Sequence, residues 1–389
     1  MSTSVIQSSI GVLLLALATT SALAAVNNSG AAFSNWPGTG LTKCYNATAE
    51  ITCPVPGLPN YYGQDAQYAG ATRSYTVLGG GTMVQDNVTG LIWEMKDKMD
   101  GKTDYVNLHD ADNTYTWCDT NPLTNGGTEG VVCGTDDTEG FIDALNGANF
   151  GGYDDWRLPT MKELLSLVDY KGSGPAIDPV FATTMQSNEY WSSTTFAAFI
   201  GAAWAVSFSD GADTADLKTN PNFVRAVRGG QTPLPNRFVD NGDTVTDTVT
   251  CLQWQEATMD TKNGVGPDTY TWQEALAASE NLTLAGHSDW RLPDIMELKP
   301  LVDFSRYNPA IDPVFASTTP SNSYWSSTTY AGNFSTAWLF SYYGGYGHRF
   351  YDSKLGVGYV RAVRSGNCSE VFPWEIFMPA INSKRAVVK

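Results

Sequence analysis

The chain has 389 residues, of which 42% are hydrophobic and 12% aromatic, so it can form two or three globular domains. Its 40 acidic residues against 23 basic residues give a net charge of −17. Nucleic acids and anionic membrane surfaces bind basic faces, and this charge therefore disfavours both as partners. Neutral glycans, cations and basic proteins remain compatible with it.

The chain begins with a segment typical of a secretory signal. Residues 1–24 carry no charged side chain, and an apolar run leads to the small-residue cleavage pattern Ala22-Leu23-Ala24. A short membrane anchor is the alternative, but the run is short and rich in Ser and Thr. No later segment approaches the length of a membrane helix. We therefore expect an exported protein, extracellular, on the cell surface or periplasmic, without a transmembrane span.

Six cysteines agree with an oxidising compartment. An internal repeat, described next, supports one pairing, because both of its positions lack cysteine in the other copy. The chain has no C-x-x-C spacing and only three histidines, which makes a zinc site unfavourable. The predicted disulfides are Cys44 with Cys53, Cys118 with Cys133, and Cys251 with Cys368, the last being the pair that the repeat supports.

Most of the chain is a duplication. D-W-R-L-P, a short helical segment and Y-W-S-S-T-T run from 155 to 195 and recur from 289 to 329, a shift of 134 residues without a gap. Two blocks in the same order predict two domains of one fold, with Pro and Gly at the boundary. The predicted division is a signal at 1–24, an irregular segment at 25–73 that packs on the first repeat, repeat one at 74–229, a linker at 230–235, repeat two at 236–368 and a C-terminal tail at 369–389.

Each repeat is predicted to begin with a β-hairpin. In repeat two, alternating residues flank Asn241-Gly242, a pair that favours tight turns between strands. Repeat one has three glycines, 79–81, at the corresponding turn. We interpret its D-N-V-T-G-L-I-W stretch, 86–93, as the second strand.

Repeat one alone carries an insertion directly after its T-Y-T-W motif, between Trp117 and Glu139. The inserted residues bring Cys133 opposite Cys118. A long insertion at one point with a disulfide at its base predicts a stapled surface loop.

Helices are predicted from capping boxes, in which a Thr or Asp side chain and a Glu three residues later satisfy free amides of the first turn. Apolar residues then follow at helical spacing, as in Met161, Leu164, Leu165 and Val168. Pro300 falls inside such a helix in repeat two and removes a backbone hydrogen bond, so we expect that helix to be shorter or kinked. The boxes are Thr160 with Glu163, Thr271 with Glu274, and Asp294 with Glu297.

The remainder of each repeat is predicted to form short antiparallel strands, because apolar residues alternate and Gly, Asn and Asp loops separate them. A hairpin, helices and strands in this order indicate an α+β fold. A disulfide between Cys251 and Cys368 joins the first hairpin to the last strand. We therefore expect the two ends of the domain to lie side by side.

Six motifs give the chain a family resemblance: D-N-V-T-G-L-I-W, W-R-L-P-T-M-K-E-L, I-D-P-V-F, Y-W-S-S-T-T, A-W-A-V-S-F and V-R-A-V-R. In this order they resemble the C-terminal domain family of the Legionella collagen-like surface protein, over both repeats. The resemblance implies an α+β module similar to the C-type-lectin-like fold and to formylglycine-generating enzymes, with paired termini and a loop-rich face used in bacterial adhesion. It thus implies two tandem C-type-lectin-like domains.

The chain departs from these relatives in three respects. It has no collagen-like Gly-x-y repeat, and its acidity is unfavourable for binding sulfated glycans. It also lacks the Glu-Pro-Asn and Trp-Asn-Asp calcium motifs of sugar-binding C-type lectins and the cysteine pair of the formylglycine enzymes. Their metal and oxidase chemistry is therefore not transferred to this chain.

Residues that both repeats share have two interpretations. Arg157 and Arg291 can bind a ligand, or pair with the Glu six residues later and clamp the start of a helix, which is the favoured interpretation. Trp191 and Trp325 can stack on a sugar ring or fill the core, and core packing is favoured. An enzyme is disfavoured, since neither repeat shows a G-x-S-x-G elbow or a matched nucleophile, base and metal set.

A calcium site is considered in the first hairpin of repeat two, where Asp240, Asp243 and Asp247 offer oxygen ligands at alternate spacing. Repeat one keeps only Asp86, the counterpart of Asp247. An Asx-rich turn accounts for the same residues and is favoured. We expect no cofactor, with calcium in repeat two as the one ion that the pattern admits.

The repeats differ most between the W-x-V-x-F strand and V-R-A-V-R. Repeat one has an acidic stretch with the ligand-binding candidates Asp210 and Asp213, whereas repeat two is rich in Tyr and Gly. Variable loops on a common framework are typical of binding proteins, and this composition resembles antibody binding loops. An edge hairpin packed on its neighbour is the alternative. The candidates in repeat two are Tyr342, Tyr343, Tyr346, His348, Arg349 and Tyr351.

These observations predict an exported bacterial adhesion protein that recognises a glycan or a protein at a cell surface. The alternative is a structural component of the cell surface or of an extracellular assembly, without a soluble ligand. Homo-oligomer formation is compatible with both. We expect recognition where the repeats differ, at the stapled insertion and at the tip formed by residues 342–351.

Overall fold

The computed structural model describes residues 36–366, with gaps at 58–59, 69, 131–132, 135, 172–173, 183–185, 187, 230–236, 263, 265, 321 and 344–349. The predicted signal, linker and C-terminal tail therefore lie outside the described residues, as does Cys368. The described residues belong to one compact unit. None of the helices within them is long and apolar enough to cross a membrane.

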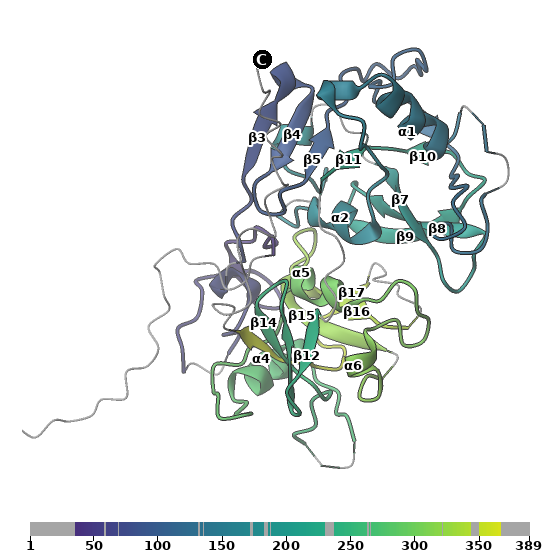
Figure 1. Ribbon diagram of the computed structural model, residues 1–389. Helices are drawn as coiled ribbons and strands as arrows, with labels where there is room; N and C mark the ends of the chain where they lie inside the picture. Colours follow the sequence, from purple (N-terminus) through teal and green to yellow (C-terminus); the bar gives the residue numbers. More distant parts are fainter. Residues whose placement is uncertain are drawn as a thin grey trace, which may run out of the picture. The chain divides into compact units, whose positions relative to one another are not determined.

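In the described part of repeat one, helices pack beside two small sheets (Figure 1). The first sheet has the order β11-β5-β4-β3 and the second the order β6-β10-β7-β8-β9. The strands are β3 (Tyr75–Leu78), β4 (Met83–Asp86), β5 (Ile92–Glu94), β6 (Thr114–Tyr115), β7 (Glu189–Thr195), β8 (Ala202–Ser207), β9 (Ala212–Leu217), β10 (Asn222–Phe223) and β11 (Val227–Arg228). The helices are α1 (Thr138–Gly147), α2 (Met161–Ser166) and α3 (Pro179–Ala182), with 3-10 turns η2 (Gly79–Gly81) and η3 (Phe150–Gly152).

Repeat two has the same plan, with sheet orders β12-β13-β14-β18 and β15-β16-β17. Its strands are β12 (Phe238–Asp240), β13 (Thr244–Asp247), β14 (Leu252–Gln255), β15 (Ser323–Thr329), β16 (Thr336–Ser341), β17 (Phe350–Ser353) and β18 (Val363–Ser365). Its helices are α4 (Trp272–Glu280), α5 (Ile295–Leu298) and α6 (Pro313–Ala316), with a 3-10 turn η4 (Lys299–Leu301). The predicted α+β fold with two tandem domains is confirmed.

The helix starts follow the sequence signals closely. All three predicted capping boxes form, since each cap side chain accepts the amide of the Glu and that Glu in turn accepts the cap amide. The apolar face of α2 is buried, as predicted from Met161, Leu164 and Leu165. Helix α5 ends at Leu298 and continues as the 3-10 turn that contains Pro300, so the predicted shortening is confirmed.

The first sheet confirms the predicted turn in repeat two and corrects one strand assignment in repeat one. The turn at Asn241-Gly242 joins β12 and β13 as predicted. Residues 86–93, interpreted as one strand, instead contain the end of β4, a turn at 87–91 and the start of β5. The reason is local: the Asp86 carboxylate accepts the Thr89 hydroxyl at 2.8 Å and closes the turn.

The two ends of each repeat lie side by side, as predicted. Strand β5 pairs with β11 in repeat one, and β14 pairs with β18 in repeat two. Cys251, directly before β14, is disulfide-bonded, while its predicted partner lies outside the described residues. The other predicted disulfides, Cys44 with Cys53 and Cys118 with Cys133, are both present.

The segment that precedes repeat one contacts both repeats, although we expected it to pack on repeat one. Arg73 donates to the carbonyl of Val168 in repeat one at 2.6 Å. The buried Asp65, in contrast, accepts the hydroxyl of Thr328 in repeat two at 2.8 Å. Its regular elements are β1 (Cys44–Tyr45), β2 (Glu50–Ile51) and the 3-10 turn η1 (Asp65–Gln67).

An apolar core shared by both repeats contains two reciprocal aromatic contacts. The ring of Trp204 in repeat one lies 5.4 Å from that of Phe304 in repeat two. The ring of Trp338 in repeat two lies 5.2 Å from that of Tyr170 in repeat one. Trp338 is the counterpart of Trp204, and Phe304 that of Tyr170, at the same shift of 134 residues. Equivalent residues therefore make the contact from both sides.

Burial should decide how much the two helix-clamping arginines stabilise the protein. Arg291 and Glu297 are each 3% exposed, whereas Arg157 and Glu163 are 38% and 18% exposed. Removing one partner of a buried pair leaves an unpaired charge and costs about 3–5 kcal/mol, against about 0–1 kcal/mol for an exposed pair. Arg291→Ala should therefore lower the free energy of unfolding in urea far more than Arg157→Ala. Equal losses would contradict this assignment.

Candidate functional site

The Y-W-S-S-T-T motif is a structural framework in both repeats. In repeat one the Trp191 indole donates to the Tyr115 carbonyl at 2.9 Å, and the Ser192 hydroxyl donates to the Trp204 carbonyl at 2.7 Å. The Thr194 hydroxyl accepts the first amide of α2 at 3.0 Å. Repeat two repeats these bonds between Trp325 and Tyr270, Ser326 and Trp338, and Thr328 and Ile295. The favoured core interpretation of Trp191 and Trp325 is confirmed, since both are fully buried.

The shared arginines belong to the same framework. Arg157 binds Glu163 through two bonds of 2.7 and 2.6 Å. Arg291 binds Glu297 through two bonds of 2.6 Å. Each Glu also completes a capping box, so the guanidinium fixes the start of a helix. The interpretation of these arginines as helix clamps is confirmed.

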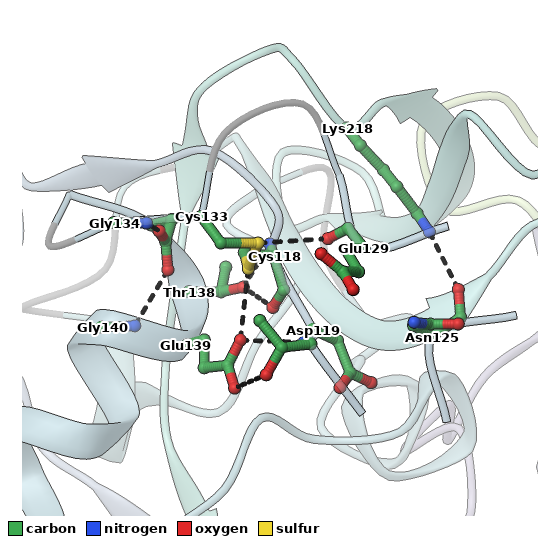
Figure 2. The surroundings of a disulfide bond; sticks show 12 residues. Cys118, Asp119, Asn125, Glu129, Cys133, Gly134, Thr138, Glu139, Gly140 and Lys218 are labelled. Atoms are coloured by element: carbon green, nitrogen blue, oxygen red, sulfur yellow. Dashed lines mark hydrogen bonds between the residues drawn. A yellow bond between two sulfur atoms is a disulfide. The ribbon is translucent and has the colours of Figure 1, made fainter. Parts of the chain in front are cut away.

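A buried lysine lies at the end of this framework in repeat one (Figure 2). The Lys218 Nζ atom lies 3.7 Å from the centre of the Trp117 ring and donates to the Thr195 hydroxyl at 3.0 Å. It also donates to the carbonyls of Asn125 at 3.1 Å and Thr128 at 2.9 Å, which both belong to the insertion. Lys218 is 1% exposed. The insertion therefore covers the ammonium group.

The insertion is fastened at its base, as Figure 2 shows. The disulfide between Cys118 and Cys133 closes the loop. The Thr138 hydroxyl at the start of α1 exchanges two 2.9 Å hydrogen bonds with the backbone of Cys118. Glu139 accepts the Thr120 hydroxyl at 2.6 Å. The predicted stapled loop is confirmed.

Repeat two has the same arrangement under a different cover. The Lys354 Nζ atom lies 4.0 Å from the centre of the Trp272 ring and donates to the Thr329 hydroxyl at 2.9 Å. Its further acceptor is the Asn46 carbonyl at 3.1 Å. Asn46 belongs to the loop that the Cys44–Cys53 disulfide closes. Two loops that are unrelated in sequence thus cover equivalent lysines.

Burying these ammonium groups is costly, because a charge loses its hydration. Burial lowers the pKa of Lys218 to about 8 and that of Lys354 to about 7. The indole face and the carbonyl dipoles offset part of the cost. Because the repeat supplies only a ring and one hydroxyl, the remaining acceptors come from a covering loop.

Sequence reasoning missed these lysines, although a signal was present. In each repeat a Lys stands six residues before the first Val of V-R-A-V-R, namely Val224 and Val360. The surrounding residues differ between the repeats, so the match is a single aligned residue in a variable stretch. The structure makes the signal recognisable, because in both repeats the lysine contacts the Trp of T-Y-T-W and the last Thr of Y-W-S-S-T-T.

The prediction of Tyr342 as a ligand contact is wrong. Its side chain is fully buried, and its ring lies 5.2 Å from that of Tyr324. The hydroxyl donates to the Leu298 carbonyl at 3.4 Å. Tyr342 follows directly on β16, whose inward-facing residues continue into the core, and it extends that core.

The acidic candidates of repeat one lie on a hairpin and not on an open loop. Asp213 belongs to β9 and is buried, and its Oδ1 atom lies 3.5 Å from the Nζ atom of Lys299 in repeat two. Its prediction as a ligand contact is therefore wrong. Asp210 is partly exposed at the turn between β8 and β9. Its carboxylate accepts the Ala212 amide at 3.2 Å, which is a turn-stabilising bond.

Two tyrosines of the predicted tip are exposed. Tyr343 is 49% exposed and Tyr351 is 40% exposed. The Tyr351 ring stacks on Tyr330 with 4.1 Å between the ring centres. The remaining candidates, Tyr346, His348 and Arg349, lie outside the described residues.

Two of the three calcium candidates, Asp247 and Asp240, are engaged in other contacts. The Asp247 carboxylate binds Arg237 through bonds of 2.9 and 2.5 Å. Asp240 accepts the Gly242 amide at 2.8 Å, as in an Asx turn. Asp243 is exposed at the same turn between β12 and β13. Within the described residues, the one close group of metal-ligand side chain types is Cys118, Cys133 and Glu139, where the sulfurs form the disulfide.

These features define a class of protein: a duplicated α+β module in which the last strand pairs with the third strand of the first sheet, and a covering loop closes a lysine–tryptophan site. The family model described as the Lcl C-terminal domain matches residues 82–228 and again residues 243–364. The chain therefore belongs to the Lcl C-terminal domain family and carries two tandem copies of the domain. No curated protein and no solved structure matches the chain.

Replacing each lysine by methionine should loosen its own cover and leave the other in place. Met keeps an apolar stem over the indole but leaves the loop carbonyls without their donor, at a cost of about 1–2 kcal/mol. Lys354→Met should speed amide hydrogen exchange in the 44–53 loop by roughly tenfold. Lys218→Met should do so in the insertion, and each variant is the control for the other. Unchanged exchange in both loops would show that the lysines do not hold them.

The contact of Asp65 with repeat two should depend on pH. Burial raises the pKa of Asp65 from 3.8 to about 7, while hydrogen bonds from Thr328 and Thr39 oppose that rise. A raised folded-state pKa contributes stability that is present below pH 4 and is lost as the pH rises through 7. Asp65→Asn retains an acceptor but cannot ionise. The variant should therefore lose less stability than the wild type between pH 4 and pH 8 in urea titrations; parallel profiles would refute this.

Proposed function

We propose that this protein is an exported binding protein that recognises a glycan or a protein ligand through loops on a duplicated framework. One observation carries the proposal: equivalent lysine–tryptophan–threonine sites in the two repeats lie under unrelated disulfide-closed loops. Binding modules vary recognition without changing their fold when different loops lie on one shared framework, as these two loops do on the lysine sites. Family membership and the disulfides support this function and an oxidising compartment.

Binding is a better account than catalysis because equivalent positions in the two repeats serve the framework. The position of Glu94 illustrates this. In repeat one the buried Glu94 accepts the Ala226 amide at 3.0 Å and lies 2.8 Å from His109. In repeat two Gln255 stands there and accepts the Ala362 amide at 3.2 Å. The role common to both repeats is thus a bond to the last strand, and proton transfer is not needed for it.

The exposed aromatic side chains supply contact area for such a ligand. The ring centres of Tyr343 and Tyr307 lie 5.7 Å apart, and the Tyr351 ring stacks on that of Tyr330. Tyr offers a large rigid surface with a hydroxyl at its end, and this suits both sugars and polypeptides. The net charge of −17 favours neutral or basic ligands over sulfated ones.

Arrays of immobilised glycans and extracellular proteins test this proposal. The wild-type chain should bind a defined subset, and a Tyr343→Ala/Tyr351→Ala variant should bind at least tenfold more weakly while still unfolding in one cooperative transition, since both side chains are more than a third exposed. Val106→Ala is the control, because Val106 is 96% exposed and lies outside these loops. Full binding by the double variant would exclude the tyrosine surface. No wild-type binding on any array would favour a structural role.

A further inference from the structure

The turn that joins the two long strands has the same geometry in both repeats. In repeat one, between β7 and β8, the Phe199 amide donates to the Phe196 carbonyl at 3.1 Å. In repeat two, between β15 and β16, the Asn333 amide donates to the Tyr330 carbonyl at 3.0 Å. Ile200 and Phe334 are counterparts on these turns. Both turns lie beside the covered lysine, since Lys218 and Lys354 donate their amides to Gly201 and Ser335.

In repeat two a piece of the same chain occupies this turn. Tyr45 stacks on Phe334 with 4.6 Å between ring centres and an interplanar angle of 19°. The next residue, Asn46, accepts the Lys354 ammonium through its carbonyl. Tyr45 is 6% exposed. The Cys44–Cys53 hairpin thus docks through one aromatic ring and one adjacent carbonyl.

In repeat one the lysine has its carbonyl acceptors, but no aromatic ring of the described chain stacks on the turn. The insertion supplies the carbonyls for Lys218, but it meets Ile200 with a glycine, Gly127, whose added Cβ would lie 3.7 Å from the Ile200 Cδ1 atom. Ile200 is 47% exposed, Phe199 is 55% exposed and Leu217 is 47% exposed. We call these three side chains the repeat-one patch.

Burial alone would favour apolar residues on the covered turn and polar residues on the exposed turn. The two repeats show the opposite. The counterparts of Phe199 and Leu217 in repeat two are Asn333 and Ser353. The turn that the hairpin covers is therefore the more polar one, and the turn that faces solvent is the more apolar one. Exposed apolar side chains in a group mark surfaces that bind other molecules.

We infer that the repeat-one patch is a docking site for a polypeptide that presents an aromatic side chain from a hairpin or extended segment, as Tyr45 does on repeat two. This inference rests on the proposed binding function and names its partner class. Stacking on Ile200 and Phe199 supplies the anchor, while the neighbouring lysine is already satisfied by the insertion. One repeat is thus closed by its own chain, and the other is open to a partner.

The chain's own hairpin provides the probe. A disulfide-closed peptide of residues 42–55, with benzoylphenylalanine in place of Tyr45, is irradiated with the full-length protein, and the cross-links are mapped by mass spectrometry. The cross-links should fall on residues 196–201 and on Leu217. Ile200→Asp and Leu217→Ser should each reduce them at least fivefold with unchanged melts, and Val106→Asp, at an exposed site elsewhere, should not.

Cross-links confined to residues 330–336 would show that the peptide only replaces the resident hairpin, and the inference would be overturned. Cross-linking that persists in both patch variants would overturn it as well. A failed proposed function has a different signature, which is no wild-type binding on the glycan and protein arrays. A chain that binds glycans but gives no cross-link retains the proposed function and loses the polypeptide site.

Discussion

Each repeat contains a buried ammonium group, and the need to supply hydrogen-bond acceptors to it constrains the rest of the structure. The repeat offers Lys218 or Lys354 an indole face and one threonine hydroxyl, which leaves part of the donor capacity unsatisfied. A charge in that position needs carbonyl oxygens from elsewhere in the chain. Both covers are loops closed by a disulfide, and each disulfide limits how far its loop can stray from the lysine. The cover is thus part of the fold as well as the variable element.

This constraint links segments that are far apart in sequence. The residues before repeat one contribute a carbonyl to Lys354, a buried carboxyl to Thr328 and a tyrosine to Glu280 at 2.7 Å. Repeat two therefore takes part of its closure from the residues that precede repeat one, whereas the loop that covers Lys218 belongs to repeat one itself. Burial raises the pKa of Glu280 to about 7, so two carboxyls at this contact titrate near neutrality. The repeats share a framework but differ in how securely it is closed.

The structure shows which features local sequence can predict. The capping boxes and the Asn241-Gly242 turn depend on neighbours within a few residues, and the two described disulfides join residues 9 and 15 positions apart, so all were predictable. The helix-clamping arginines were also within reach, because each partner Glu stands six residues away. Tyr342 and Asp213 were mispredicted, because their burial is set by Leu298 and Lys299, which are distant in sequence. The lysine site was missed for the same reason, since its parts meet only in the folded chain.

Trp204 and Trp338 each contact an aromatic ring of the other repeat. Such reciprocal contacts between equivalent residues are typical of an isologous dimer, and here both halves belong to one polypeptide. Joining the two halves covalently makes their association intramolecular, so a modest contact area suffices to hold it. It also removes a restriction. Two separate copies of one domain must carry identical ends, whereas a fused pair can keep the symmetric contact and let each end acquire its own sequence. The duplication thereby permits one closed end and one exposed end in a single molecule.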